Sequence, residues 1–367
     1  MKRMTRFVLP LLAMVLIAAC GSDNKTSSSG GGTASAAPAK KIALLLPETK
    51  TARYETQDRP LFEAKMKQLC PNCEVLYSNA NQDASVQQSQ AEAALTNGAN
   101  VLVLDPVDSA AAAAIVAKAN AQNVPVIAYD RLLKNSKVDF YISFDNERVG
   151  ELQAQALVDE MNKQGKQGGT IVMINGSPTD NNATLFKKGA HSVIDTSGYK
   201  VGSEFDTPDW SPDKAQQEME QAITALGKDK IVGVYAANDG TAGGAIASLK
   251  AAGFLPLPPV TGQDAELAGI QRILAGDQFM TVYKAIKLEA EAAAELAFAL
   301  ATGAQPPAGR VNGSVNNGQM DVPSVLLTPV SVTKDNVKST VVADGFWKVS
   351  DICTAGFQTA CQAAGIS

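Results

Sequence analysis

The chain has 367 residues, 45% of them apolar, and a formal net charge of -5. That length accommodates two domains with substantial cores, and no basic block lies beyond the first six residues, which argues against a nucleic-acid partner. His191 is the single histidine and falls in a segment expected to be a surface helix, so histidine-based catalytic dyads and zinc sites are nearly excluded.

The N-terminal sequence is typical of a targeting segment. Basic residues precede an apolar run, Phe7 to Ala19, that is too short to span a bilayer as a mature helix. It ends at Ala18-Ala19-Cys20-Gly21, which resembles the lipobox of bacterial lipoproteins and implies cleavage before Cys20 and a lipid on its sulfur. A plain signal peptide cut elsewhere is the alternative. Small and polar residues fill 21–40 and predict a flexible tether.

From Lys41 onward, expected strands and helices alternate in two successive series. The strands of the first series are 42–46, 74–77, 101–104, 125–128 and 139–143, and its helices are 60–69, 83–96, 108–120 and 145–161. The strands of the second are 170–174, 199–205, 231–236, 259–262 and 280–283, and its helices are 181–194, 212–226, 240–252, 265–274 and 288–301. After Gly303 the chain is loop-rich, with one extended segment at 325–328.

This alternation predicts an α/β protein with two doubly wound parallel-sheet lobes. No disordered linker marks the break near 145–150. Independent domains would be joined by such a linker, so we expect short segments to cross directly between the lobes, as a hinge requires.

Four cysteines follow Cys20, in two close pairs: Cys70 with Cys73, and Cys353 with Cys361. Because an exported protein meets oxidising conditions, we expect two local disulfides. A redox role for Cys70-Pro71-Asn72-Cys73 is disfavoured, since the expected helix precedes the pair and presents the wrong end of its dipole to a thiolate. A zinc site shared by the four has no supporting spacing.

Polar side chains follow the expected strands of both series where each strand ends. They are Asp130-Arg131, Asp180-Asn181-Asn182, Asn238-Asp239 and Gln263-Asp264. Open α/β sheets bind ligands at the carboxyl ends of their strands, so we expect one shared site. Asp, Asn and Arg together match the donors and acceptors of sugar hydroxyls, which favours a small polyol as ligand.

Each of these positions also has a simpler interpretation. Asp130 and Arg131 are compatible with a surface ion pair, and Asp180 and Asp264 with helix N-caps. Of the pair at 238–239, we expect the aspartate to cap the next helix and the asparagine to contact the ligand. Recurrence at strand ends in both series favours binding over these local roles.

Two aromatic residues and one lysine complete the candidate site. Trp210, in the polar loop 206–213, is either a stacking platform for a sugar ring or a partly buried staple, and we favour stacking. Tyr54 follows Arg53 after the first strand and is expected to face Trp210 across a cleft. Lys284 ends the strand 280–283, where an exposed charge is the simpler interpretation. Acidic pairs are present, but nothing marks one as a general acid, so we expect neither an enzyme nor a cofactor or metal.

Several long motifs resemble the xylose-binding members of the periplasmic sugar-binding proteins that serve bacterial ABC import. The similarity covers roughly residues 41–347. The motifs are Ala128-Tyr129-Asp130-Arg131-Leu132, the segments 139–147 and 176–183, Ala237-Asn238-Asp239-Gly240, Gly262-Gln263-Asp264-Ala265 and Met280-Thr281-Val282-Tyr283-Lys284.

The resemblance implies a type I periplasmic-binding-protein fold whose lobes are joined by a three-segment hinge. It implies an N-terminal lobe of 41–145 and 285–325, a C-terminal lobe of 146–284 and 326–345, and a tail of 346–367. The site residues it implies are Arg53, Tyr54, Asp130, Arg131, Asp180, Asn182, Trp210, Asn238, Asp264 and Lys284. The family commonly has a tryptophan where this chain has Tyr54, and the loop here is one residue longer, so stacking on that side is expected to differ.

The expected protein is a monomeric, lipid-anchored solute-binding protein facing the periplasm or cell exterior. It is expected to capture D-xylose or a related aldose and to present it to an ABC-transporter permease. A sugar sensor that presents its closed form to a chemoreceptor or histidine kinase is the alternative. The sensor domain of a transcription regulator is disfavoured, because it would carry a DNA-binding helix-turn-helix in place of the segment ending at Cys20.

Overall fold

The computed structural model describes residues 39–366, and its larger sheet has seven strands in the order β10-β11-β5-β4-β3-β1-β2. All neighbours are parallel except β10 and β11. We call this sheet and the helices on it the first lobe. Its strands are β1 (Lys41–Leu46), β2 (Glu74–Asn79), β3 (Val101–Leu104), β4 (Val126–Tyr129), β5 (Phe140–Phe144), β10 (Gly313–Asn316) and β11 (Asp321–Leu327).

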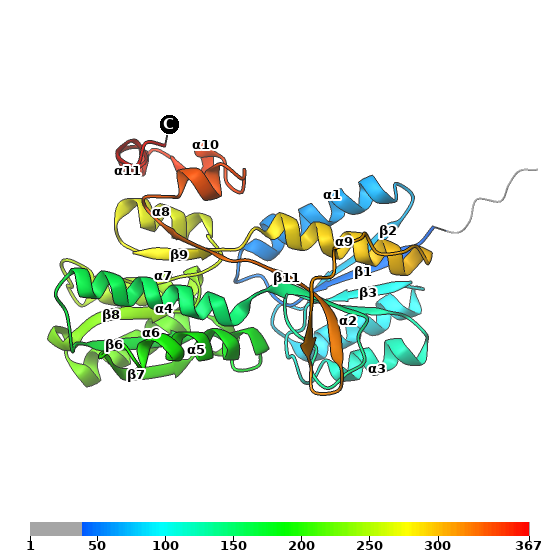
Figure 1. Cartoon of the computed structure of the whole chain (residues 1–367), viewed down its shortest axis with the longest axis horizontal. Helices are drawn as coiled ribbons and strands as arrows, with labels where there is room; N and C mark the ends of the chain where they lie inside the picture. Colours follow the sequence, from blue (N-terminus) through cyan, green and yellow to red (C-terminus); the bar gives the residue numbers. More distant parts are fainter. Residues whose placement is uncertain (1–38, 367) are drawn as a thin grey trace, which may run out of the picture. The chain divides into compact units, whose positions relative to one another are not determined.

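Helices cover both faces of this sheet, which is why β1 is almost continuously apolar. α1 (Arg59–Leu69) and α9 (Ile286–Thr302) lie side by side on one face (Figure 1), where Phe62 and Met66 pack with the alanines of α9. α2 (Ala84–Thr96) and α3 (Ala113–Ala121) pack on the other face. A short π-helix, η1 (Tyr54–Asp58), leads into α1.

The second lobe is built on β6 (Thr170–Asn175), which pairs in parallel with β7 (Lys200–Asp206) and β8 (Ile231–Ala236). β9 (Met280–Tyr283) pairs with β12 (Val330–Thr333) in antiparallel fashion. The strand expected at 259–262 is not continuous. It is reduced to two isolated bridges, Val234 with Val260 and Gln263 with Val282, which link β8 to β9.

The helices of the second lobe also form two layers. Those on one side are α4 (Asn146–Lys163) and α5 (Asn181–Ile194), and those on the other are α6 (Pro212–Leu226) and α7 (Asp239–Ala251), with α8 (Leu267–Ala275) beside β9. Glycines let α4 and α5 approach closely, since a Cβ on Gly150 would lie 1.9 Å from the Phe186 carbonyl oxygen. Short 3-10 helices, η2 (Pro208–Trp210) and η3 (Lys228–Lys230), join the larger elements.

The chain passes between the lobes three times, from β5 to α4, from β9 to α9 and from β11 to β12 (Figure 1). The predicted fold, two doubly wound lobes joined by three segments, is therefore confirmed. The late part of the chain is more regular than expected, because 303–333 holds β10, β11 and β12 in place of one extended segment. Since β11 pairs with β5 as far as Leu327, the boundary expected after Val325 falls inside that strand.

The last residues are not a loose tail. After η4 (Lys338–Val342), the helices α10 (Val349–Ile352) and α11 (Gln358–Ala363) pack against α8. Phe346, Ile352 and Ile366 are buried in the same cluster as Ile270 and Ile273 of α8. The segment 346–366 therefore belongs to the core of the second lobe.

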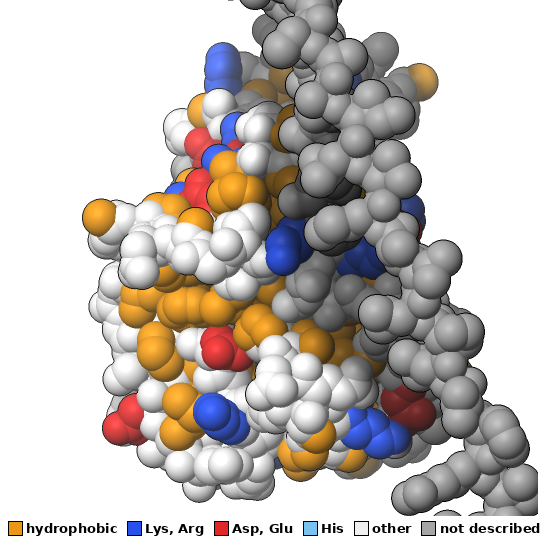
Figure 2. Space-filling model, turned by 90° about the vertical axis from the view of Figure 1, so that its right-hand side faces the viewer, with side chains coloured by type: hydrophobic (Ala, Val, Ile, Leu, Met, Phe, Trp, Pro, Cys, Tyr) orange, Lys and Arg blue, Asp and Glu red, His pale blue; other side chains and the backbone are white. Residues whose placement is uncertain are grey.

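Both expected disulfides are present, Cys70–Cys73 after α1 and Cys353–Cys361 in the C-terminal segment. Cys20, the signal segment 1–20 and all but the end of the tether 21–40 lie outside the described residues. Across residues 39–366, no helix combines the length and apolar character needed to cross a membrane. Among the coloured, described residues on the face shown in Figure 2, acidic and basic side chains are scattered among polar and apolar ones without forming a patch of one sign.

Candidate functional site

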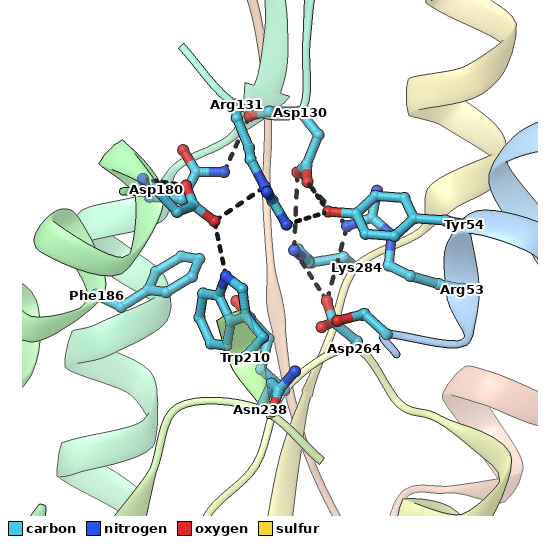
Figure 3. Close-up of a pocket in the computed structure, with 13 residues that line it drawn as sticks. Arg53, Tyr54, Asp130, Arg131, Asp180, Phe186, Trp210, Asn238, Asp264 and Lys284 are labelled. Atoms are coloured by element: carbon cyan, nitrogen blue, oxygen red, sulfur yellow. Dashed lines mark hydrogen bonds and ion pairs between the residues drawn. The ribbon is translucent and has the colours of Figure 1, made fainter. Parts of the chain in front are cut away.

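One cavity lies between the carboxyl ends of the strands of both lobes, and all ten predicted ligand-binding residues line it (Figure 3). The space inside it that the centre of a water molecule can occupy is ≈ 20 Å³. Three further residues line the cavity: Thr51 and Phe186, which were not predicted, and Gln263, which was expected at a strand end but not named as a ligand contact. Phe186 lies four positions after Asn182 on α5, so helical spacing alone would have placed it on the same face.

The first loop contributes Arg53, whose guanidinium is fixed by buried carboxylates. Its Nη2 donates to Asp58 at 2.6 Å and to Glu289 of α9 at 2.9 Å. Nη1 then faces the cavity, 3.5 Å from Asp130 and 3.7 Å from Asp264. Because Asp264 belongs to the second lobe, Arg53 faces carboxylates from both sides of the cavity.

Tyr54 links the first loop to the end of β4. Its hydroxyl donates to Asp130 Oδ2 at 3.0 Å and accepts from Arg131 Nη2 at 3.1 Å. Asp130 is held at φ 54°, a left-handed conformation that turns its carboxylate back toward Tyr54 and Arg53. The acidic and basic residues at 130–131 are both buried, so the simpler interpretation of a surface ion pair is wrong.

The cavity keeps Asp130 ionised. Burial raises the pKa of this carboxyl. The positive charges of Arg53, Lys284 and Arg131 lower it by more, so that the net pKa is about 2. Burial also raises the pKa of Glu289, which sits behind Arg53 away from the cavity. At neutral pH the site therefore offers a charged acceptor next to three cationic donors.

Asp180 has three roles on the second lobe. Its Oδ1 accepts from the Asn182 amide at 2.8 Å and caps α5, as the cap interpretation expected. Its Oδ2 accepts from the Trp210 indole at 3.1 Å and lies 3.0 Å from Arg131 Nε of the first lobe. The Asn182 side-chain amide crosses to the first lobe as well and donates to the Asp130 carbonyl at 3.0 Å.

Aromatic rings stand on opposite sides of the cavity, with Trp210 and Phe186 facing Tyr54 (Figure 3). Trp210 meets Phe186 edge to face, with ring centroids 6.3 Å apart. A Cβ on Gly176 would lie 2.0 Å from the indole, so glycine is required there for the ring to reach the cavity. Trp210 is nearly fully buried, so it packs in the core, and it also lines the cavity, where its ring is placed for stacking.

The expectation that Asp239 caps α7 is wrong. Asn238 is the N-cap of α7: its Oδ1 accepts from the Thr241 amide at 2.8 Å, within a capping box. Asp239 is fully buried, and its carboxylate accepts from Gln278 and from the Glu266 amide. The cap uses the oxygen of the Asn238 side chain, so its amide nitrogen is the group left to face the cavity.

Lys284 and Asp264 close the cavity next to the hinge. The lysine Nζ lies 2.9 Å from Asp264 Oδ1 and 3.9 Å from Asp130 Oδ1. Both side chains are buried, so Lys284 is not the exposed charge of the simpler interpretation. Gln263 lies beside them, and its Oε1 has no hydrogen-bond partner within residues 39–366.

The arrangement suits a neutral ligand with several hydroxyl groups. Carboxylates accept, guanidinium, ammonium and amide groups donate, and the rings offer flat apolar faces. Among the side chains that line the cavity, three basic groups face three acidic ones. The sequence did not identify Asp58 and Glu289, which hold Arg53 from behind, because neither lies at the end of a strand.

The chain is similar to several known proteins. The model of the periplasmic binding protein domain matches residues 42–305. The D-xylose-binding periplasmic protein of Escherichia coli (strain K12) is 43% identical over 86% of this chain and 94% of its own length. The multiple sugar-binding periplasmic receptor ChvE of Rhizobium radiobacter is 37% identical over 74% of this chain and 81% of its own.

A solved structure of a solute binding protein is also similar to this chain. An ABC transporter solute binding protein from Clostridium phytofermentans, with bound β-D-glucose, has a TM-score of 0.79 and 30% identity to this chain. The alignment covers 85% of this chain and 100% of that one.

Proposed function

We propose that this chain, which belongs to the periplasmic binding protein domain family, captures a monosaccharide between its lobes and delivers it to an ABC importer. D-xylose or a related aldose is the favoured sugar, because the relative named for D-xylose aligns with most of the chain. The process is binding, without bond chemistry. The ten predicted residues are proposed as the sugar contacts.

The convergence of the two lobes on one cavity carries this proposal. Asp130 and Arg131 come from the first lobe, and Asp180 and Asn182 from the second, yet they contact one another directly. A sugar between them would touch both lobes only in the closed arrangement. It would then stabilise that arrangement by its differential affinity, and the closed form is the one proposed to meet the permease.

The membrane anchor is a separate part of the proposal. The lipobox-like run before Cys20 supports cleavage there and lipidation of the cysteine sulfur. Cys20→Ser is expected to release the protein from membranes into the soluble fraction. Continued membrane retention of that variant would remove the lipid anchor from the proposal and leave sugar capture untouched.

Titration calorimetry against xylose, ribose, arabinose, glucose and galactose tests sugar capture. We expect xylose to bind most tightly and to raise the unfolding midpoint by mass action. Tighter binding of another sugar would overturn the preference for xylose alone. If none of the five binds, the proposal of a monosaccharide ligand is wrong.

A further inference from the structure

The C-terminal segment reaches the back of the sugar site through two adjacent residues, Phe346 and Trp347. The Phe346 carbonyl accepts from Gln57 of η1 at 3.1 Å. The Trp347 indole donates to the Ala265 carbonyl at 2.8 Å. These contacts join the segment to both sides of the cavity, because η1 starts beside Arg53 and Ala265 follows Asp264.

The turn that carries Asp264 is strained. Asp264 has φ 86° and Ala265 has φ 48°, and both are non-glycine residues in the left-handed region. Such a conformation costs on the order of 1–3 kcal/mol and persists only when its surroundings hold it. The direction of the Asp264 carboxylate toward Arg53 and Lys284 depends on this turn.

Hydrogen bonds hold the turn from two sides. On the β9 side, the Asp264 amide donates to the Val282 carbonyl at 2.9 Å and the Ala265 amide donates to Thr281 Oγ1 at 3.2 Å. On the outer side, Trp347 is the hydrogen-bond donor to the Ala265 carbonyl within the described part of the chain. The indole is half-buried and packs edge to face against Phe346 at 5.5 Å.

We propose that Trp347 is a positioning residue for the sugar site, acting through the Ala265 carbonyl to hold the Asp264 carboxylate in place. This inference rests on the proposed function, because it assigns Trp347 an effect on sugar affinity without any contact with the sugar. It also gives the packed C-terminal segment, with its Cys353–Cys361 disulfide, a part in ligand binding.

Trp347→Phe removes the indole N–H and keeps an aromatic ring against Phe346. We expect xylose affinity to fall about fivefold, the effect of one neutral hydrogen bond. Gln271→Ala is the matched control, because Gln271 of α8 donates to the Ile352 carbonyl of the same segment without reaching the turn. The control should leave affinity within about twofold of the unmodified protein.

A double-mutant cycle with Asp264→Asn separates positioning from general stabilisation. Asparagine tolerates the left-handed conformation and removes the charge that Trp347 is proposed to position. If the proposal holds, Trp347→Phe loses most of its effect on affinity in the Asp264→Asn background. An equal loss in both backgrounds, or an unchanged affinity for Trp347→Phe, would overturn it.

Affinities are compared at a temperature where circular dichroism shows every variant fully folded, so a lowered unfolding midpoint does not obscure the result. The unmodified protein separates this test from that of the proposed function. If it binds no sugar, the proposed function fails, whereas if it binds xylose and the cycle is additive, only the role of Trp347 fails.

Discussion

Arg131 is a fully buried cation with partners on both lobes. Its Nε lies 3.0 Å from Asp180 and 3.5 Å from Asp105, and its Nη2 donates to Tyr54. Asp105 is fully buried, and no hydrogen bond to its carboxylate is present among residues 39–366. Burial raises the pKa of the Asp105 carboxyl by more than the charge of Arg131 lowers it, so the net pKa is well above the usual range. The planar fork of arginine is what allows one side chain to serve three partners.

Arg131→Lys is therefore expected to be damaging despite conserving charge. An ammonium group is a point charge that cannot reach Asp180, Tyr54 and Asp105 together, so a buried carboxylate loses its partner. We expect xylose affinity to fall at least about tenfold and the free energy of unfolding to drop by about 3 kcal/mol. Calorimetry and urea unfolding measure the two. Arg148→Lys, at an exposed pair with Glu151, should change neither, and equal effects at both positions would contradict this account.

His191 offers a clean test of surface electrostatics, because it is the single histidine of the chain. Partial burial lowers its pKa, but hydrogen bonds with Asp195 and Glu204 raise it by more, to a net value above the usual one. A raised folded-state pKa means that protonation stabilises the fold. The contribution is fully present below about pH 6.5 and is lost as pH rises through the folded-state pKa.

NMR titration of the imidazole should give a pKa above about 6.5 that Glu204→Gln lowers. The free energy of unfolding should decline by less than about 1 kcal/mol over the same pH range, since the group is partly exposed. His191→Asn should remove this decline. A pKa at or below that of a free histidine would show that the ion pairs at this surface contribute nothing.

At the scale of elements, the site is assembled from helix starts. Asp180 caps α5 and Asn238 caps α7, and the same side chains line the cavity. This overlap explains why the sequence predicted residues that line the cavity but assigned the cap of α7 to Asp239. Asn and Asp are both good N-caps, so the residue types alone could not tell which of 238 and 239 would cap the helix. Asp239 is instead buried, and its carboxylate accepts hydrogen bonds from Gln278 and Thr281.

Two substitutions separate the cap from the ligand contact at Asn238. Serine caps helices about as well as asparagine, so Asn238→Ser should hold the free energy of unfolding within about 0.5 kcal/mol. Asn238→Ala removes the cap and should cost about 1 kcal/mol. Both remove the amide nitrogen, so both should weaken xylose binding to a similar extent. Unchanged affinity in the serine variant would limit Asn238 to a structural role.

Elements beyond 303 were predicted poorly, for identifiable reasons. β10 and β11 form an antiparallel hairpin joined by the loop 317–320. In this loop the Asn317 side chain donates to the Leu133 and Ser136 carbonyls of a distant loop. Contacts so far apart in sequence leave no local pattern. The segment expected to form a strand at 259–262 makes isolated bridges instead, one to β8 and one to β9. β1, β3 and β4 were predicted well, since burial on both faces makes them continuously apolar.

At the scale of the whole molecule, the lobes also meet outside the cavity. Ser109, after β3, donates its amide to the Thr179 carbonyl at 3.0 Å and accepts from the Asn181 amide through its Oγ at 3.1 Å. The Thr179 hydroxyl donates to the Val107 carbonyl at 3.2 Å. None of these residues lines the cavity. The contacts stabilise the closed arrangement without touching a ligand, so they set part of the apparent affinity.

Ser109→Ala tests this coupling. Removing Oγ leaves the Asn181 amide without its acceptor only when the lobes are closed. The closed arrangement is therefore destabilised, whereas the open one is not. Because apparent affinity scales with the population of the binding-competent form, we expect xylose to bind about threefold to tenfold more weakly. Sugar-induced compaction, followed by small-angle X-ray scattering, should then require more xylose. Ser89→Ala, on the exposed side of α2, is the control. Equal affinity in the two variants would mean that contacts through the ligand alone determine closure.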